Sequence, residues 1–222
     1  MTVTAQTARL NRTRFLAFGD SLTAGEVTVP TTTSRNTGEQ NYPLVIVPSA
    51  AYPTVLATML RARYVSQASV IEVINTGLSG EWAQDGALRL PGVLTANRPE
   101  AVLLLEGVND LGTPNGPSDA GRAIATMAQE IRARGARVFL ATLPPSRPGG
   151  FRSVSNSLIM SLNARIRVTA TSEGAVLVDV YPVFEADLNR YIGVDGLHPT
   201  EAGYQRLAEL FFNAIRTDLE AR

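Results

Sequence analysis

The chain has a single histidine, His198, so any mechanism that needs an imidazole depends on this one position. His198 follows Asp195 by three residues in a turn-forming segment just before the last helix expected in the chain. A carboxylate at that spacing can hydrogen-bond one ring nitrogen, which fixes the tautomer and leaves the other nitrogen to accept a proton. The pair is therefore a candidate general base with its orienting carboxylate. The alternative is a helix N-terminal turn with a solvent-facing histidine.

A candidate nucleophile lies near the other end of the chain. Ser21 follows Gly19 and Asp20, directly after the apolar run Phe15–Phe18. At the end of a buried strand, a serine hydroxyl can face a cleft while its own backbone N–H points at an oxyanion. The segment is not the G-x-S-x-G nucleophile elbow, because Thr23 stands where the last glycine would be. The alternative is a strand end with an Asp-Ser helix cap.

Two more turns follow apolar runs. The segment 75–81 contains two glycines, which permit close approach of backbone to a ligand, and Asn109 can offer a side-chain N–H where negative charge develops. Ordinary βα and Asn-Asp turns are the alternatives for these two segments. Each feature is weak alone. Together they place a nucleophile, further donors and a base at strand ends or turns on one rim, and this set indicates acyl transfer through a serine.

The pattern of apolar runs predicts the elements that must position these residues. Five runs are apolar throughout, as in parallel strands covered on both faces: Phe15–Phe18, Val70–Ile74, Ala101–Leu105, Val138–Thr142 and Val176–Val180. Helical patterns lie between and after them, at Tyr52–Arg63, Gln84–Ala96, Ser118–Arg134, Ser155–Ser172 and Thr200–Leu219. Alternating strands and helices predict an α/β fold with a mostly parallel sheet in a three-layer sandwich.

The domain organisation follows from the same pattern. No repeat or linker interrupts the 222 residues, so we expect one domain over 1–222, with 1–13 as a flexible N-terminal extension. Two segments do not fit the alternation: Glu26–Ala51, and the Pro- and Gly-rich Leu143–Val154. Loops of this length in a compact domain are usually functional or mobile, and both follow a predicted strand's carboxyl end, where open α/β sheets bind ligands.

Composition excludes several classes of function. Lysine plus arginine equals aspartate plus glutamate, at 20 each, so there is no general electrostatic reason to bind nucleic acid or an anionic membrane. The absence of cysteine excludes a catalytic thiol, a thiolate metal site and disulfides. No stretch approaches the roughly 20 apolar residues of a membrane span, and residues 1–14 lack the apolar core of a signal peptide. We expect a cytoplasmic protein, or a secreted one if a signal has been removed.

With these motifs in order along the chain, the sequence resembles the GDSL-type members of the SGNH hydrolase superfamily, which includes thioesterases, lysophospholipases and carbohydrate acetylesterases. The matching segments run from Gly19 to Pro199. The resemblance implies a flavodoxin-like sheet of five strands in the order 2-1-3-4-5, with the serine after the central strand. The long segment 26–51 and the loop 143–154 depart from the family pattern and leave the acyl and alcohol specificity open.

The resemblance also implies a role for each site residue. Ser21 is the nucleophile, His198 the base and Asp195 its orienting carboxylate. The oxyanion is held by the N–H groups of Ser21 and Gly80, with Gly77 as the alternative to Gly80, and by the amide of Asn109. No metal or cofactor is required.

The substrate pocket is less sharply defined by the sequence. We expect Asp20 and Trp82 to contribute to it. Trp82 is the only tryptophan and follows Gly80 by two residues, so it could line an acyl pocket or belong to the core.

The activity expected is hydrolysis of a small-molecule carboxylic ester, with short acyl chains, through an acyl-enzyme. A carbohydrate O-acetylesterase and an acyltransferase use the same residues and remain alternatives. From a different class, a catalytically silent carbohydrate- or lipid-binding module would keep the fold without turnover. The sequence does not define the oligomeric state.

Overall fold

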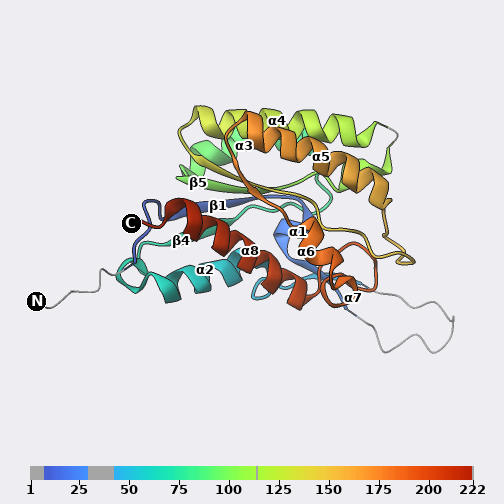
Figure 1. The fold of residues 1–222 in the computed structure, drawn as a ribbon, viewed down its shortest axis with the longest axis horizontal. Helices are drawn as coiled ribbons and strands as arrows, with labels where there is room; N and C mark the ends of the chain where they lie inside the picture. Colours follow the sequence, from blue (N-terminus) through green and yellow to red (C-terminus); the bar gives the residue numbers. More distant parts are fainter. Residues whose placement is uncertain (1–7, 30–42, 114, 222) are drawn as a thin grey trace, which may run out of the picture.

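A parallel five-stranded sheet lies between two layers of helices (Figure 1). The structure is a computed structural model that describes residues 8–29, 43–113 and 115–221. The sheet has the order β4-β1-β5-β6-β7, and its strands are β1 (Arg14–Gly19), β4 (Glu72–Asn75), β5 (Ala101–Leu105), β6 (Arg137–Ala141) and β7 (Val176–Val178). The predicted α/β sandwich and the strand order 2-1-3-4-5 are confirmed.

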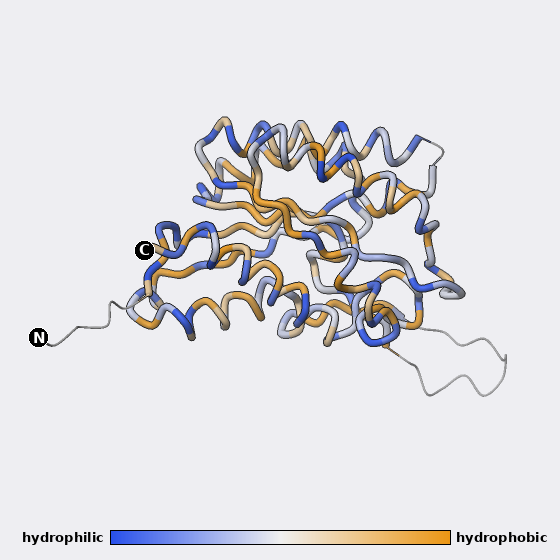
Figure 2. Tube along the Cα trace, viewed as in Figure 1, coloured by the Kyte–Doolittle hydropathy of each residue, from blue (hydrophilic) through white to orange (hydrophobic). Residues whose placement is uncertain are grey.

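The central strands are apolar along their whole length because both faces of the sheet are covered. Every residue of β5 and residues 15–19 of β1 are buried, and the hydrophobic stretches of the chain run through the middle layer (Figure 2). Parallel register places Gly19 beside Leu105, so β1 and β5 end together. Whatever follows these two strands is therefore brought to the same edge of the sheet.

Helices α3, α4 and α5 cover one face of the sheet, and α2 and α8 cover the other (Figure 1). Their bounds are α2 (Tyr52–Arg63), α3 (Ala83–Asn97), α4 (Gly116–Ala133), α5 (Asn156–Ser172) and α8 (Glu201–Leu219). Short helices are α1 (Ser21–Ala24), α6 (Tyr181–Glu185) and α7 (Leu188–Tyr191), with 3-10 turns at Val65–Gln67 and Asn109–Gly112. Across the described ranges, no helix has the length and apolar character needed to cross a membrane.

The predicted helices agree with the observed bounds to within two residues, whereas two strands are shorter than predicted. Strand β7 ends at Val178 because the Thr142 hydroxyl accepts the N–H groups of Val180 and Tyr181, at 2.8 and 3.2 Å. Strand β4 begins at Glu72 because the N–H groups before it bond within the preceding turn. At β7 a side-chain hydroxyl from a distant segment replaces the sheet pairing, and at β4 hydrogen bonds within the preceding turn replace it.

Residues 8–13 belong to the segment 1–13, which was expected to be a flexible extension. From residue 8 onwards the segment packs on the body of the protein, and Leu10 is buried. The side chain of Gln67 hydrogen-bonds both the N–H and the carbonyl of Leu10, at 2.7 and 3.0 Å. Leu10 also pairs with Glu220, so the two ends of the described chain lie side by side. Residues 1–7 lie outside the described residues.

The long segment after Ser21 contains a hairpin that the sequence analysis did not predict. Strand β2 (Glu26–Thr28) pairs antiparallel with β3 (Leu44–Ile46). The N–H of Val47 bonds the carbonyl of Gly25, and the N–H of Gly25 bonds the carbonyl of Ser21. The hairpin is therefore tied by the backbone to the turn that carries Ser21. Residues 30–42 of this segment lie outside the described residues.

Candidate active site

Ser21 stands where β1 passes into α1, at the carboxyl edge of the sheet. A Cβ on Gly19 would lie 1.8 Å from the carbonyl oxygen of Leu105, so only glycine lets the two strand ends approach this closely. The Asp20 carboxylate then accepts the N–H of Leu22 at 2.9 Å and caps the short helix. The strand end and the cap together hold Ser21 in a fixed position.

Ser21, His198 and Asp195, the three residues proposed from the sequence, form one continuous chain of contacts. The Oγ of Ser21 is 3.0 Å from Nε2 of His198, and Nδ1 of His198 is 2.6 Å from Oδ2 of Asp195. All three residues are buried. The segments that supply them are 177 residues apart in sequence, so the fold alone brings them together.

The Asp195 carboxylate is held in its charged form by several donors. Burial by itself would raise the pKa of Asp195, but the hydrogen bond from His198 and those from the backbone lower the pKa below its usual value. Its second oxygen accepts the N–H groups of Leu197 and His198, at 3.0 and 3.1 Å. The acid therefore remains ionised and fixes the orientation of the imidazole ring.

The Pro- and Gly-rich loop 143–154 supports the turn that carries Asp195. The N–H of Arg152 donates to the Asp195 carbonyl at 2.8 Å, and the Ser146 hydroxyl donates to the Gly196 carbonyl at 2.7 Å. A Cβ on Gly150 would lie 2.3 Å from the Asp195 backbone, so glycine is required for this contact. The loop 143–154 therefore stabilises the turn that carries Asp195.

The three expected oxyanion donors lie in turns at strand ends of this same edge. Gly80 adopts φ +76°, and no hydrogen bond of its N–H is found in the described part of the chain. By contrast, the N–H of Gly77 bonds the Asn75 side chain at 2.9 Å, and a Cβ on Gly77 would lie 2.2 Å from Ala24 N. Gly77 is thus occupied in packing, which favours Gly80 as the donor.

The amide of Asn109 is oriented by a neighbouring carbonyl. Its Nδ2 donates one hydrogen to the Glu81 carbonyl at 2.8 Å. An amide nitrogen has two hydrogens, so this bond fixes the group and leaves the second N–H for a ligand. The N–H of Ala83 bonds the Asp110 carboxylate at 3.0 Å, so the turn of Asn109 is tied to the turn that follows Gly80.

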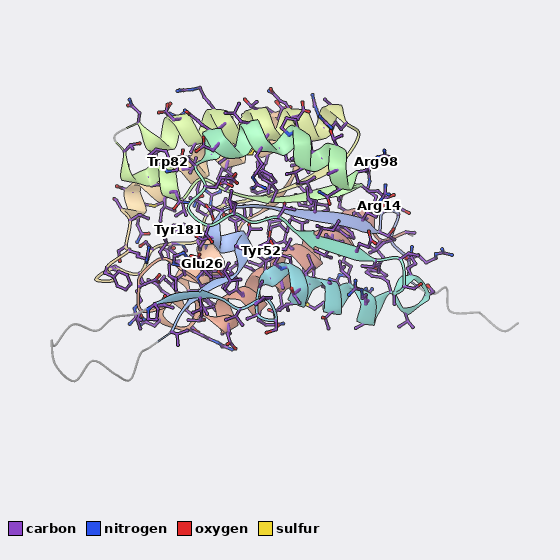
Figure 3. The ribbon with its side chains drawn as sticks, turned by 180° about the vertical axis from the view of Figure 1, so that it is seen from behind. Arg14, Glu26, Tyr52, Trp82, Arg98 and Tyr181 are labelled. Carbon is purple, nitrogen blue, oxygen red and sulfur yellow. The ribbon has the colours of Figure 1, made fainter. Side chains whose placement is uncertain are left out.

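Of the two residues expected at the substrate pocket, the structure exposes one and buries the other. Trp82 is 45% exposed, which excludes the core alternative. It lines a hollow of about 290 Å³ with polar neighbours, namely Gln84, Asp110, Thr113, Asn115 and Asp119. Trp82 lies toward the same end of the molecule as Glu26 and Tyr181, whereas Arg14 and Arg98 lie toward the other (Figure 3).

Asp20, the other residue expected at the substrate pocket, is fully buried, and its carboxylate caps α1. Burial raises the pKa of Asp20 to about 6, against the opposing effect of bonds from Leu22 and Val108. The neighbouring Glu106 is also buried, and burial, with the nearby charges of Asp20 and Glu81, raises its pKa well above the usual value. Asp20, which precedes Ser21, and Glu106 are thus a neighbouring pair of buried acids with raised pKa values.

Glu26 is a site residue that the sequence analysis did not identify. Its Oε2 lies 3.3 Å from Nε2 of His198, on the nitrogen that also faces Ser21. Glu26 is the first residue of β2 and follows Ser21 by five positions. Its only signal in the sequence is its place at the start of the segment that departs from the family pattern, and no spacing rule relates it to His198.

A three-layer α/β fold that carries a buried Ser-His-Asp chain at the carboxyl edge of its sheet defines the structural class of the serine hydrolases. Comparison with known proteins specifies the family within this class. The chain belongs to the GDSL-like lipase/acylhydrolase family, whose model matches residues 17–206. The family resemblance seen in the sequence is thus confirmed.

Individual relatives agree with this assignment. The chain is 28% identical to Esterase TesA of Pseudomonas aeruginosa over 153 residues, which cover 68% of this chain and 73% of that protein. A lipase/acylhydrolase from Enterococcus faecalis superposes with a TM-score of 0.74 at 22% identity, over 94% of this chain and 97% of the other. An acetyl-xylooligosaccharide esterase from Geobacillus gives 0.71 at 21% identity, over 93% and 95%. These structural matches show the shared fold.

Proposed function

We propose that the protein hydrolyses carboxylic esters through an acyl-enzyme formed on Ser21. The observation that carries this proposal is the unbroken chain from Ser21 Oγ through both ring nitrogens of His198 to Asp195. A solvent-facing histidine on a helix turn, the alternative raised by the sequence, does not account for a ring buried between a hydroxyl and a carboxylate. Family membership supports the same activity.

The reaction follows from the roles of these groups. His198 Nε2 takes the proton of the Ser21 hydroxyl as Oγ attacks the ester carbonyl carbon, and Asp195 stabilises the imidazolium that forms. The N–H groups of Ser21, Gly80 and Asn109 hold the negative oxygen of the tetrahedral intermediate. His198 then protonates the leaving alcohol. In the second half, His198 activates water, which releases the acid and restores Ser21.

The Asn109→Ala variant tests the oxyanion site. We expect kcat to fall by about 100- to 1,000-fold with little change in KM, because the amide bond strengthens mainly when charge develops. Steady-state kinetics on p-nitrophenyl acetate measures both constants. Asn213→Ala, which removes an exposed amide from α8, is the matched control. An unchanged kcat in Asn109→Ala would remove this residue from the site.

A series of p-nitrophenyl esters from acetyl to palmitoyl tests the acyl specificity. We expect kcat/KM to be highest for short chains, because no described segment forms a large amphipathic lid over Ser21. Such an apolar surface would be needed to bury a long acyl chain away from water. A steady rise in kcat/KM from acetyl to palmitoyl would contradict this expectation. Absence of turnover on every ester would favour the silent binding module instead.

A second candidate, hydrolysis of carbohydrate acetates, is favoured by the surroundings of Trp82. A half-exposed indole beside amide, hydroxyl and carboxylate side chains offers a sugar ring both an apolar face and hydrogen-bond partners. The acetyl-xylooligosaccharide esterase of the same fold is consistent with such a substrate. Comparison of kcat/KM on an acetylated xylooligosaccharide and on p-nitrophenyl acetate separates the two candidates.

A further inference from the structure

The imidazole of His198 lies between two carboxylates, one on each ring nitrogen. Asp195 Oδ2 is 2.6 Å from Nδ1, and Glu26 Oε2 is 3.3 Å from Nε2, where Ser21 Oγ lies at 3.0 Å. The Glu26 side chain is only 14% exposed, so solvent screens its charge weakly. The proposed reaction uses Asp195 and leaves the second carboxylate without a role.

Glu26 is held in this position by its backbone. The hydroxyl of the buried Tyr204 donates to the Glu26 carbonyl at 2.7 Å, and Glu26 pairs with Ile46 in the hairpin. The preceding residue, Gly25, donates its N–H to the Ser21 carbonyl at 3.1 Å. The Cα of Glu26 is thus anchored to both α8 and α1.

The charge of Glu26 acts differently on the two forms of His198. In the neutral ring, Nδ1–H donates to Asp195 and the Nε2 lone pair accepts from Ser21, so the lone pair also faces the Glu26 carboxylate unfavourably. In the charged ring, Nε2–H can donate to Ser21 or Glu26. An anion at this distance therefore stabilises the imidazolium.

Asp20, which is buried next to Ser21, also interacts electrostatically with His198, and burial raises the pKa of Asp20 to about 6. Burial, with the charges of Asp20, Glu26 and Asp195, raises the pKa of Tyr204 well above its usual value, so Tyr204 stays neutral. Among the described residues, Glu26 is the one carboxylate in contact with the nitrogen that exchanges a proton with Ser21.

We propose that Glu26 is a positioning residue for the catalytic proton: its carboxylate favours the proton on His198 Nε2, both in the resting enzyme and in the transition state. This inference builds on the proposed function and adds a built-in acid switch to it. A protonated ring cannot act as the base. In the transition state the same carboxylate stabilises the imidazolium that forms as the ring accepts the serine proton.

The single histidine permits a test that does not depend on activity. With ring-labelled histidine, the NMR signal of His198 can be followed against pH in wild type and in Glu26→Gln. We expect the titration midpoint to fall by roughly one pH unit in the variant, because removal of the anion lets the imidazolium lose its proton at lower pH. The matched control is Glu72→Gln, the same change at an exposed position of β4. A midpoint that stays or rises in Glu26→Gln overturns the proposal.

Kinetics provide a second readout for the same variants. We expect the acid limb of kcat/KM to move to lower pH by the same amount, while the plateau falls by up to about tenfold, since one pH unit corresponds to a tenfold change in equilibrium. A purely structural effect would lower the whole profile without moving its midpoint, and this result would overturn the proposal. Glu26→Asp keeps the negative charge but moves it away from His198, because the side chain is one methylene shorter. It should give an intermediate midpoint, and it replaces Glu26→Gln in the test if that variant does not fold.

The two proposals can fail separately. If wild type hydrolyses no ester but the NMR midpoint still falls in Glu26→Gln, the proposed function fails while the effect of Glu26 on His198 stands. If the esterase is active and neither the NMR midpoint nor the acid limb moves, the proposed function stands and the inference on Glu26 is wrong.

Discussion

Replacing Ser21 by alanine should reduce kcat on p-nitrophenyl acetate by on the order of a million-fold, the size of loss that follows removal of a triad member. Among the described residues, Ser21 has the one hydroxyl in contact with His198 Nε2, so without it no acyl-enzyme forms. Catalysis by the oxyanion donors alone should leave a small residual rate above that of water. The measurement is the steady-state rate of a variant preparation that contains no contaminating wild-type enzyme.

Two controls keep this result specific to the Ser21 hydroxyl. Ser79→Ala removes an exposed serine hydroxyl from the rim of the site and should keep wild-type turnover. A fluorophosphonate probe should label Ser21 in wild type and nothing in Ser21→Ala. Labelling of another serine, or turnover in Ser21→Ala close to that of wild type, would contradict the assignment of Ser21 as the nucleophile.

His198→Ala should be about as damaging as Ser21→Ala, because the chain has no other imidazole to take the serine proton. In wild type, kcat/KM should be low in acid and rise with pH to a plateau, since only the neutral ring accepts that proton. The pKa of Asp195 lies below its usual value, so this carboxylate stays charged throughout that rise. The variant should lose the rise together with the rate.

The losses in rate caused by Ser21→Ala and His198→Ala should not be additive in free energy. If Ser21 and His198 act as one unit, the double variant should lose about as much as either single variant, because each alone already prevents acyl-enzyme formation. If the fold-loss in the double variant equals the product of the two single fold-losses, Ser21 and His198 have independent roles. A His198→Ala variant with near-wild-type turnover at neutral pH would remove the general base from the proposed mechanism.

Much of the fold could be predicted from local sequence because the strands of a covered parallel sheet must be apolar throughout. The run 101–105 shows this most clearly, since all five residues are buried in β5. Strand ends were less predictable. The stop at Val178 depends on the Thr142 hydroxyl, which is 36 residues away in sequence and has no local signature.

The contacts among Ser21, His198 and Asp195 could be proposed from the sequence because each residue stands in a distinctive local segment and the chain has one histidine. The remaining site residues depend on tertiary contacts. Glu26 reaches His198 only because a hairpin folds back on α1, and Asp20 is a buried helix cap although its place beside Ser21 suggests a pocket wall. Glu106 gains its raised pKa from burial next to Asp20 and Glu81, which no spacing along the chain reveals.

The pairing of Leu10 with Glu220, near the two limits of the described residues, has a practical consequence. Leu10 and Glu220 meet at the end of the sheet where β1 begins, whereas Ser21 and α1 lie at the other end (Figure 1). A tether attached after Glu220 therefore leaves the candidate site facing away from a support. Immobilised through the C-terminus, the enzyme should present its site outward to substrates borne on particles or polymers. The same adjacency makes the fold suited to circular permutation, in which a short linker joins the ends.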